Sequence, residues 1–174
     1  MKIIKTPIKD LIILKTNLYE DNRGYFKEIS RNSFFKKTFK FDCLSFSKKN
    51  TLRGFHIQLK NTQAKFVTVT HGKILDVVAD VRKNSKTFGK TFSIEMSEKS
   101  DFSLFIPKGL AHAFLCKSKS CVIYYKCDEY QNKQNEKTIA WNDENLGIDW
   151  GIKKPIMSKK DQNGISLNEF KTLI

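Results

Sequence analysis

Short segments in which apolar and polar residues alternate dominate the middle of the chain. The clearest covers residues 74–81, where one face is entirely apolar and the other carries Asp76 and Asp80 beside two apolar side chains. Alternation with a period of two is the pattern of a β-strand. Turn residues separate the segments at the spacing of an antiparallel sandwich or barrel, so the pattern predicts an all-β fold. The further segments of this kind are residues 66–70, 91–96, 102–106, 112–116 and 121–126.

Helices are a minor part of the prediction. Asn32 or Ser33 can cap a short helix that runs through Phe39, and Ser166 precedes a second helix over residues 167–173. Serine and asparagine are favoured at this position because their side chains accept hydrogen bonds from the first free N–H groups. The polar residues between 131 and 137 are expected to form a loop.

Length and composition indicate a folded domain. The chain has 174 residues, of which 40% are hydrophobic and 12% aromatic. This composition excludes disordered and collagen-like classes, and the length favours one domain over residues 1–174. The aliphatic run at residues 11–14 is far shorter than the ~20 residues of a membrane-spanning helix, and too short for a signal peptide. We expect a cytoplasmic protein without a membrane partner.

The net charge of +14 would suit a polyanionic partner, but the residues that carry it argue against one. Only four of the 32 basic residues are arginine, the side chain best suited to bidentate contacts with bases and phosphates. The lysines are spread along the chain and form no single stripe. We therefore predict a solvated, lysine-rich surface and no nucleic-acid partner.

Several common chemical motifs are missing. The four cysteines form no Cys-x-x-Cys pair, so the sequence signals neither a zinc knuckle nor a thioredoxin-type site, and we expect reduced thiols. The chain also lacks a Gly-x-Gly-x-x-Gly turn, a Walker-type loop and a Gly-x-Ser-x-Gly turn. The informative residues are the histidines, His56, His71 and His112.

Two of these histidines lie in segments that resemble the cupin signature. Residues 107–112, Pro-Lys-Gly-Leu-Ala-His, resemble its second half, a tight turn that leads into a strand whose histidine faces the barrel interior. Metal-binding cupins carry His-x-His in the first half, whereas residues 56–58 read His-Ile-Gln. Two imidazoles without a third ligand make a poor metal site, so we expect no metal. His71, beside Gly72 in a turn, is typical of a structural residue.

A longer set of motifs carries a family resemblance. Residues 51–58, Thr-Leu-Arg-Gly-Phe-His-Ile-Gln, resemble the Leu-Arg-Gly-x-His-x-Gln motif of the dTDP-4-dehydrorhamnose 3,5-epimerases. Other segments are similar to that family at corresponding places along nearly the whole chain. The resemblance implies a cupin-type antiparallel β-barrel, or jelly roll. These other segments are residues 21–26, 63–67, 76–82, 87–90, 106–114, 124–127, 141–150 and 157–161.

The resemblance implies epimerisation of a nucleotide-diphosphate 4-keto sugar for cell-surface polysaccharide synthesis. C3 and C5 of such a sugar flank the carbonyl, so their protons are acidic, and inversion needs a base and an acid on opposite faces. The resemblance assigns His56 as the base, Asp161 as the carboxylate that orients it and Tyr125 as the acid. It places Lys65 beside the enolate oxygen, where a positive charge is stabilising. No redox or metal cofactor is needed.

The same resemblance implies substrate contacts and a homodimer. Arg23 and Glu28 are expected to reach the diphosphate-sugar site, either in their own chain or from the neighbouring subunit. Arg53 is expected near the diphosphate. Gln58 and His112 complete the expected substrate-binding residues.

Strand geometry gives two expectations that a structure can check. Strict alternation would put Arg53 and His56 on opposite faces, and Gly54 between them permits a bulge that brings both to one side. In residues 121–126 the alternation separates Tyr124 from its neighbour, so only one of the two adjacent tyrosines can face the interior. The family match selects the second.

Three assigned residues have a plainer interpretation from the residues alone. Asp161 lies in a polar stretch, residues 159–163, that is typical of a solvated loop. Lys65 is one of many lysines, most of which must lie at the surface. Tyr125 could equally be a core aromatic residue.

Departures from the family occur where it binds the nucleotide. The family's Gln-x-Asn-x-Ser becomes Phe-Asp-Cys-Leu-Ser at residues 41–45, and a Tyr-Tyr pair becomes Tyr-Gln at residues 130–131. These changes leave open whether the substrate is dTDP-4-keto-6-deoxyglucose or a GDP-linked 4-keto heptose, and whether C3 alone is inverted. A 3,4-ketoisomerase of the same fold ranks lower, because such proteins carry Arg-Gly-x-His-x-His. A non-catalytic sugar-nucleotide or nucleic-acid binding module is the alternative from another class.

Overall fold

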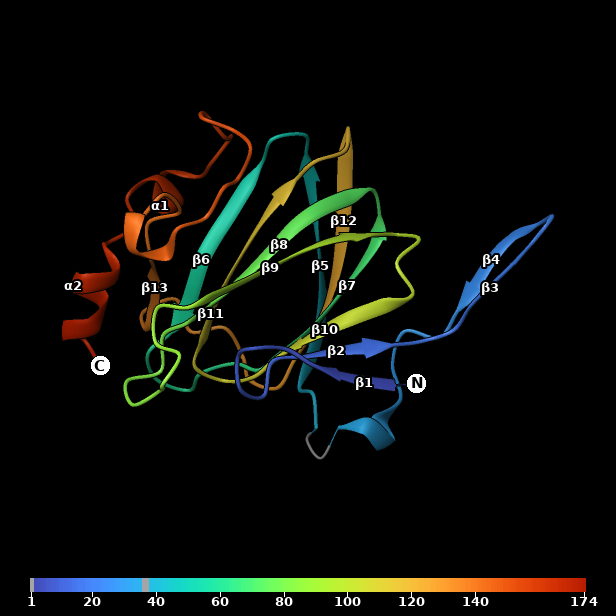
Figure 1. Ribbon diagram of the computed structural model, residues 1–174, viewed down its shortest axis with the longest axis horizontal. Coiled ribbons are helices and arrows are strands. Elements are labelled where there is room, and N and C mark those ends of the chain that lie inside the picture. Colours follow the sequence, from blue (N-terminus) through green and yellow to red (C-terminus); the bar gives the residue numbers. More distant parts are fainter. Residues whose placement is uncertain (1, 36–37) are drawn as a thin grey trace.

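Two antiparallel sheets form the body of the computed structural model, which describes residues 2–35 and 38–174 (Figure 1). The larger sheet has six strands, in the spatial order β1 (Lys2–Lys5), β2 (Ile12–Lys15), β10 (Phe102–Ile106), β7 (Lys65–His71), β12 (Ser120–Cys127) and β5 (Phe41–Lys48). The smaller sheet has five strands, in the order β13 (Glu136–Thr138), β6 (Leu52–Gln58), β11 (Leu110–Cys116), β8 (Lys73–Asp80) and β9 (Thr91–Ser97). From β5 to β13 the chain passes back and forth between the two sheets, except at the hairpin β8–β9, as in a jelly roll.

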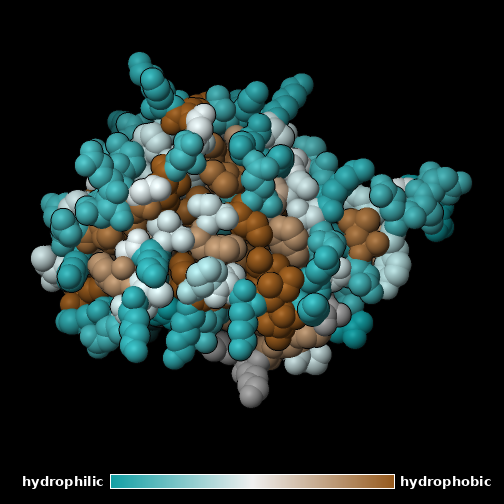
Figure 2. All heavy atoms as spheres, in the orientation of Figure 1, coloured by the Kyte–Doolittle hydropathy of each residue, from teal (hydrophilic) through white to brown (hydrophobic). Residues whose placement is uncertain are grey.

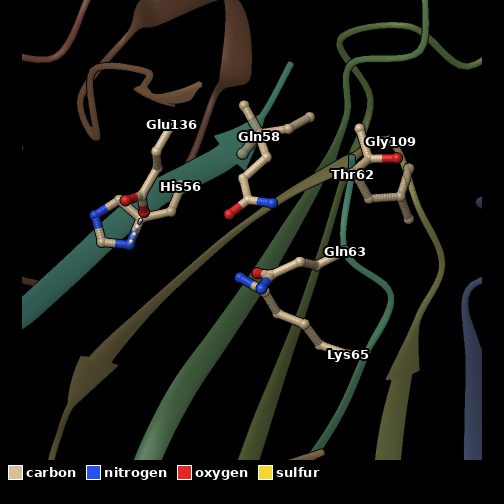
Figure 3. A pocket seen from close by; sticks show the side chains of 9 residues that line it. His56, Gln58, Thr62, Gln63, Lys65, Gly109 and Glu136 are labelled. Atoms are coloured by element: carbon tan, nitrogen blue, oxygen red, sulfur yellow. Dashed lines mark ion pairs between the residues drawn. The ribbon is translucent and has the colours of Figure 1, made fainter. Parts of the chain in front are cut away.

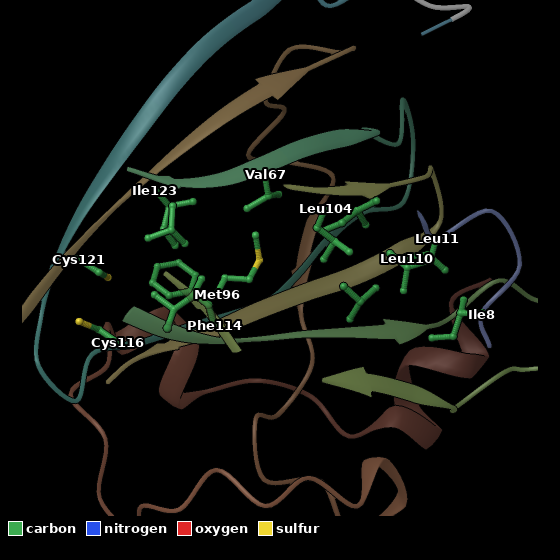
Figure 4. Close-up of a cluster of buried hydrophobic side chains, with 14 residues drawn as sticks. Ile8, Leu11, Val67, Met96, Leu104, Leu110, Phe114, Cys116, Cys121 and Ile123 are labelled. Atoms are coloured by element: carbon green, nitrogen blue, oxygen red, sulfur yellow. The ribbon is translucent and has the colours of Figure 1, made fainter. Parts of the chain in front are cut away.

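Apolar side chains from both sheets fill the space between them (Figure 4). In β8, Ile74 and Val78 point into this space, on the face that the alternation assigned to them. Burial of such side chains is the main stabilising contribution to the fold. The members shown in Figure 4 include Val67, Met96, Leu104, Leu110, Phe114 and Ile123.

A second apolar cluster lies on the other face of the five-stranded sheet, where the C-terminal segment covers it. Val77 and Ala79 of β8 pack in this cluster with Trp150 and Phe170. The segment ends in α2 (Leu167–Thr172), which Ser166 caps in a capping box. The strand β8 is therefore buried on both faces. Its alternating side chains pack into the two apolar clusters in turn.

The all-β antiparallel fold and the predicted strands are confirmed, and so is the C-terminal helix. No strand pairing joins the two sheets into a closed barrel within residues 2–35 and 38–174. The predicted helix through Phe39 is wrong beyond its start: a 3₁₀ turn covers Asn32–Phe34, and residues 35, 38 and 39 are not helical. Residues 36–37 lie outside the described part. Residues 131–137 are not all loop, because Glu136 begins β13.

A two-stranded hairpin, β3 (Leu18–Asp21) and β4 (Gly24–Lys27), projects from the body (Figure 1). Figure 2 shows apolar surface near its base, among hydrophilic side chains that dominate this face of the molecule.

The short helices are η1 (Asn32–Phe34), η2 (Glu144–Leu146), α1 (Lys159–Gln162) and α2, and none of the described helices is long and apolar enough to cross a bilayer.

Candidate active site

A cavity of about 420 Å³ opens between the two sheets. Side chains from both sheets line it, and Figure 3 views the wall formed by His56, Gln63, Lys65 and Glu136. This is a common size for a pocket that holds a small ligand. The polar side chains that line the cavity are Ser45, Arg53, His56, Gln63, Lys65, His112, Tyr125, Gln131 and Glu136.

A bulge in β6 brings Arg53 and His56 to the cavity together, as predicted. On β11, His112 pairs with His56 and Phe114 pairs with Arg53, so a step of three residues on β6 faces a step of two. Gly54 inside the bulge has φ +112°, and a Cβ there would lie 2.4 Å from the carbonyl oxygen of His112. Only glycine accepts both this conformation and this close approach.

His56 is hydrogen-bonded to a buried carboxylate. Its Nε2 lies 2.5 Å from Oδ1 of Asp161. Burial alone would raise the pKa of Asp161, but the hydrogen bond from His56 and the nearby positive charges hold that pKa below its usual value. Asp161 is therefore an ionised acceptor, so Nε2 carries the ring hydrogen and Nδ1 is the nitrogen that can accept a proton.

Asp161 reaches His56 from the short helix α1. Ser158 caps this helix and accepts a hydrogen bond from the backbone N–H of Asp161. The preceding segment is fixed to the start of β6, because Ile156 exchanges backbone hydrogen bonds with Asn50 and Leu52. Asp161 is only 3% exposed, so the interpretation of its polar stretch as a solvated loop is wrong.

A second imidazole–carboxylate pair lies beside the first. Nε2 of His112 is 2.8 Å from Oδ2 of Asp76 on β8, and both side chains are buried. The other oxygen of Asp76 is buried without a hydrogen-bond partner among the described residues. Sequence reasoning placed Asp76 beside Ile74 and Val78, on the face opposite the wholly apolar one, and gave it no role, although a carboxylate among apolar residues is a signal for a partner.

Lys65 points into the cavity from the first position of β7. Burial lowers the pKa of its ammonium group, although Glu136 and Asp76 are near enough to oppose that shift. No ion pair engages Lys65 in the two described stretches of the chain. The plainer interpretation of Lys65 as a surface lysine is wrong, and its charge is available to an anionic oxygen in the cavity.

Tyr125 faces the cavity, as the family match predicted, and Tyr124 lies on the opposite face of the strand, as the alternation predicted. The Tyr125 hydroxyl lies 3.4 Å from Oγ of Ser45, and its ring meets the His112 ring edge-on, with centroids 6.4 Å apart. Burial raises the pKa of the Tyr125 phenol well above its usual value. The phenol therefore keeps its proton at neutral pH.

The Gln58 side chain forms hydrogen bonds with the backbone of two loops. Its Nε2 donates to the backbone oxygens of Asn61 at 2.8 Å and Tyr130 at 3.4 Å, and its Oε1 accepts from the N–H of Asn132 at 2.6 Å. The amide that was expected to bind substrate is occupied by the backbone that shapes this end of the cavity.

Arg23 and Glu28 do not line the cavity of their own chain. Arg23 pairs with Asp21 on the projecting hairpin, and Glu28 pairs with Arg31. His71 pairs with Glu98 at the surface, at 3.3 Å, away from the cavity. The role of Arg23 and Glu28 in substrate binding stays a prediction.

Residues 5–169 match the sequence model of the family dTDP-4-dehydrorhamnose 3,5-epimerase. The chain belongs to this family. The match confirms the epimerase class and the fold that the motifs predicted. Among this family, the dTDP-4-dehydrorhamnose 3,5-epimerase of Methanothermobacter thermautotrophicus is 38% identical over 176 residues, which cover 97% of this chain and 95% of that protein.

Two further epimerases are similar to the chain. The one from Neisseria gonorrhoeae is 39% identical over 170 residues, and the chain spans about half of that longer protein, 52% of its length. The crystal structure of dTDP-6-deoxy-D-glucose-3,5-epimerase from Legionella pneumophila, in complex with dTDP-4-keto-L-rhamnose, is similar with a TM-score of 0.91. It is 35% identical and covers 96% of this chain and 93% of that chain.

Proposed function

We propose that the cavity binds a nucleotide-diphosphate 4-keto sugar, in the first place dTDP-4-keto-6-deoxyglucose, and inverts it at C3 and C5. The observation that carries this proposal is the placement of two proton-transfer groups. His56, held by Asp161, faces the cavity from the five-stranded sheet, and Tyr125 faces it from the six-stranded sheet. A sugar ring between the sheets would have a base on one face and an acid on the other.

In the first step, Nδ1 of His56 takes the proton from the carbon next to the carbonyl. The C–H bonding electrons move into the ring to form the enolate, and the negative charge develops on the C4 oxygen. Lys65 supplies a fixed positive charge inside the same cavity, where low water content strengthens its effect. Asp161 stabilises the imidazolium that results.

In the second step, the Tyr125 hydroxyl gives its proton to the opposite face of the same carbon. The products are the inverted centre, an imidazolium at His56 and a phenolate at Tyr125. Because burial raises the pKa of Tyr125, the phenolate readily regains a proton. Proton exchange with water resets both groups, so no redox or metal cofactor takes part.

Substrate binding is assigned to residues around this centre. Arg53 donates from Nε to Ser47 at 3.0 Å and from Nη2 to the Phe46 carbonyl at 3.1 Å, which holds its guanidinium at the cavity edge for a diphosphate. His112 is placed to contact the sugar. The rings of Phe41 and Tyr130 stack with centroids 5.7 Å apart and offer a surface for the base.

We also propose a homodimer in the cytoplasm. The hairpin β3–β4 exposes Tyr19 at 61%, Tyr25 at 41% and Phe26 at 70%, and exposed apolar side chains that lie close together mark a surface that a partner can cover. A second copy that covers this hairpin would bring Arg23 and Glu28 toward its own cavity. The free thiols of the described cysteines suit a reducing compartment.

The experiment is incubation with candidate 4-keto sugar nucleotides in heavy water, followed by NMR of C3 and C5. We expect deuterium at both carbons and inverted products from the dTDP-linked sugar. A carbonyl moved to C3 would indicate the ketoisomerase, and deuterium at C3 alone a monoepimerase. Turnover only with a GDP-linked heptose would show that this heptose, and not the dTDP-linked sugar, is the substrate. Binding without exchange would indicate a non-catalytic module.

A further inference from the structure

We infer that Glu136 is a positioning residue that strengthens His56 as a base from the side opposite Asp161, and that Lys160 limits this effect. The inference rests on the proposed function, in which His56 removes the substrate proton. The inference gives a role to a carboxylate in a segment that the sequence predicted to be a polar loop.

Glu136 is held against His56 by the pairing of their strands. Thr138 of β13 pairs with His56, and Glu136 pairs with Gln58 on the same strand as the histidine. The Glu136 side chain is 9% exposed, and its Oε1 lies 3.9 Å from Nδ1 of His56 (Figure 3). This distance is too long for a hydrogen bond and short enough for a strong interaction between charges.

Glu136 is ionised in this position. Burial alone would raise its pKa, but the hydrogen bond from Lys160 and the charges of His56 and Lys160 hold that pKa below the usual value. Nζ of Lys160 lies 2.7 Å from Oε2 of Glu136. Lys160 immediately precedes Asp161, so the four-residue helix α1 controls the surroundings of both ring nitrogens of His56.

The consequence concerns the protonated form of His56. When Nδ1 takes a proton, the imidazolium lies between two carboxylates, whereas the neutral ring gains little from either. Glu136 thus favours proton uptake, and Lys160 weakens this effect by neutralising Glu136. The other charged or titratable groups that face this end of the cavity are His112 with Asp76, Lys65 and Tyr125. They are identical in all the variants compared below.

The test compares Glu136→Gln, Glu136→Asp and Lys160→Gln with the unchanged protein. NMR follows the ring signals of His56 during a pH titration without substrate, and kinetics give kcat/KM against pH. In Glu136→Gln we expect the midpoint of the His56 titration, and the acid limb of kcat/KM, to move down by about one pH unit. We expect kcat/KM on its plateau to fall by roughly ten-fold.

The other variants test the direction of the shift in the His56 midpoint. Lys160→Gln must move the midpoint to higher pH, and Glu136→Asp must restore part of the loss. The matched control is Glu95→Gln, which removes an exposed carboxylate that also binds two lysines, Lys73 and Lys117, and should change neither readout.

An unchanged His56 midpoint in Glu136→Gln, with or without lost activity, would overturn the inference and leave Glu136 as a substrate contact or structural residue. If Glu136→Gln does not fold, a midpoint in Lys160→Gln that stays or moves down overturns it equally. A protein that exchanges no deuterium into any candidate sugar would refute the proposed function. The titration would then still decide whether Glu136 acts on His56.

Discussion

His56 on β6 and His112 on β11 face each other across paired strands, and each contacts a buried aspartate. The His56 side chain is 27% exposed, and its aspartate comes from a helix 105 residues further along the chain. The His112 side chain is 6% exposed, and its aspartate comes from the adjacent strand β8. An accessible imidazole can exchange protons with a ligand, whereas a buried one chiefly satisfies its partner. We assign the chemistry to the first pair and the rigidity of the cavity wall to the second.

The strongest test of this comparison replaces each histidine by alanine. His56→Ala should lower deuterium incorporation at both carbons by on the order of 10²–10⁴ or more. His112→Ala should destabilise the protein by about 1–3 kcal/mol, because it removes the hydrogen-bond partner of the buried Asp76 carboxylate. NMR exchange and urea unfolding measure the two effects. Exchange at the unchanged rate in His56→Ala would remove it as the base.

Replacing the tyrosines separates exchange from inversion. Tyr125→Phe should keep some deuterium exchange at C3, because His56 can remove and return a proton on one face, while inversion falls by about 10²–10⁴. Tyr124→Phe is the control, since its side chain lies on the outer face of β12, and it should change neither. Product stereochemistry by NMR gives the answer. If Tyr124→Phe is the variant that stops inversion, the acid is misassigned.

Amide substitutions compare the two carboxylates directly. Asp161→Asn should slow exchange by about 10- to 100-fold, less than His56→Ala, because it disturbs the ring tautomer and orientation but keeps the base. Asp76→Asn should instead act on stability, by about 1–3 kcal/mol, since it disturbs a buried hydrogen bond. Equal kinetic effects of the two variants would mean that both pairs take part in proton transfer.

Acid pH should weaken the first pair in a defined window. The pKa of Asp161 is lowered in the folded state, so its stabilising effect is complete above its usual value of 3.8 and is lost as the pH falls through the lower folded value. Each unit of lowering contributes about 1.4 kcal/mol. The unfolding free energy of the unchanged protein should therefore fall more steeply below that pH than that of Asp161→Asn. Parallel curves would contradict the ionised pair.

The smallest expected effect is that of a chelator. Treatment with EDTA should leave the exchange rate unchanged, because every proposed step is a proton transfer or a charge interaction with a side chain. Re-addition of divalent ions after dialysis is the control. Lost turnover that returns with one metal ion would overturn this part of the proposal.

The sequence predicted a strand correctly where all the side chains on one face of that strand have the same kind of surroundings. In β8 and β12 the alternation predicted the strand and separated its two faces, and the family motif selected Tyr125 as the tyrosine that faces inward. The edge strand β5 was missed because polar and apolar residues occur on both its faces. The family motif, and not periodicity, identified Asp161, since a helix of four residues leaves no pattern.

Neither the alternation nor the family motif identified Glu136. Its segment has three residues, and its proximity to His56 results from pairing between strands that are far apart in the sequence. The use of the Gln58 amide by three backbone groups is also a product of loop packing, which no local pattern records.

The separation of 105 residues between His56 and Asp161 sets an order of events during synthesis. His56 leaves the ribosome roughly a hundred residues before Asp161 and Lys160, so a growing chain can complete most of both sheets while its base still lacks an oriented partner. Only the arrival of α1 fixes the ring and gives it the correct tautomer. Proton transfer would then begin as one of the last events of folding, after the cavity walls are already in place.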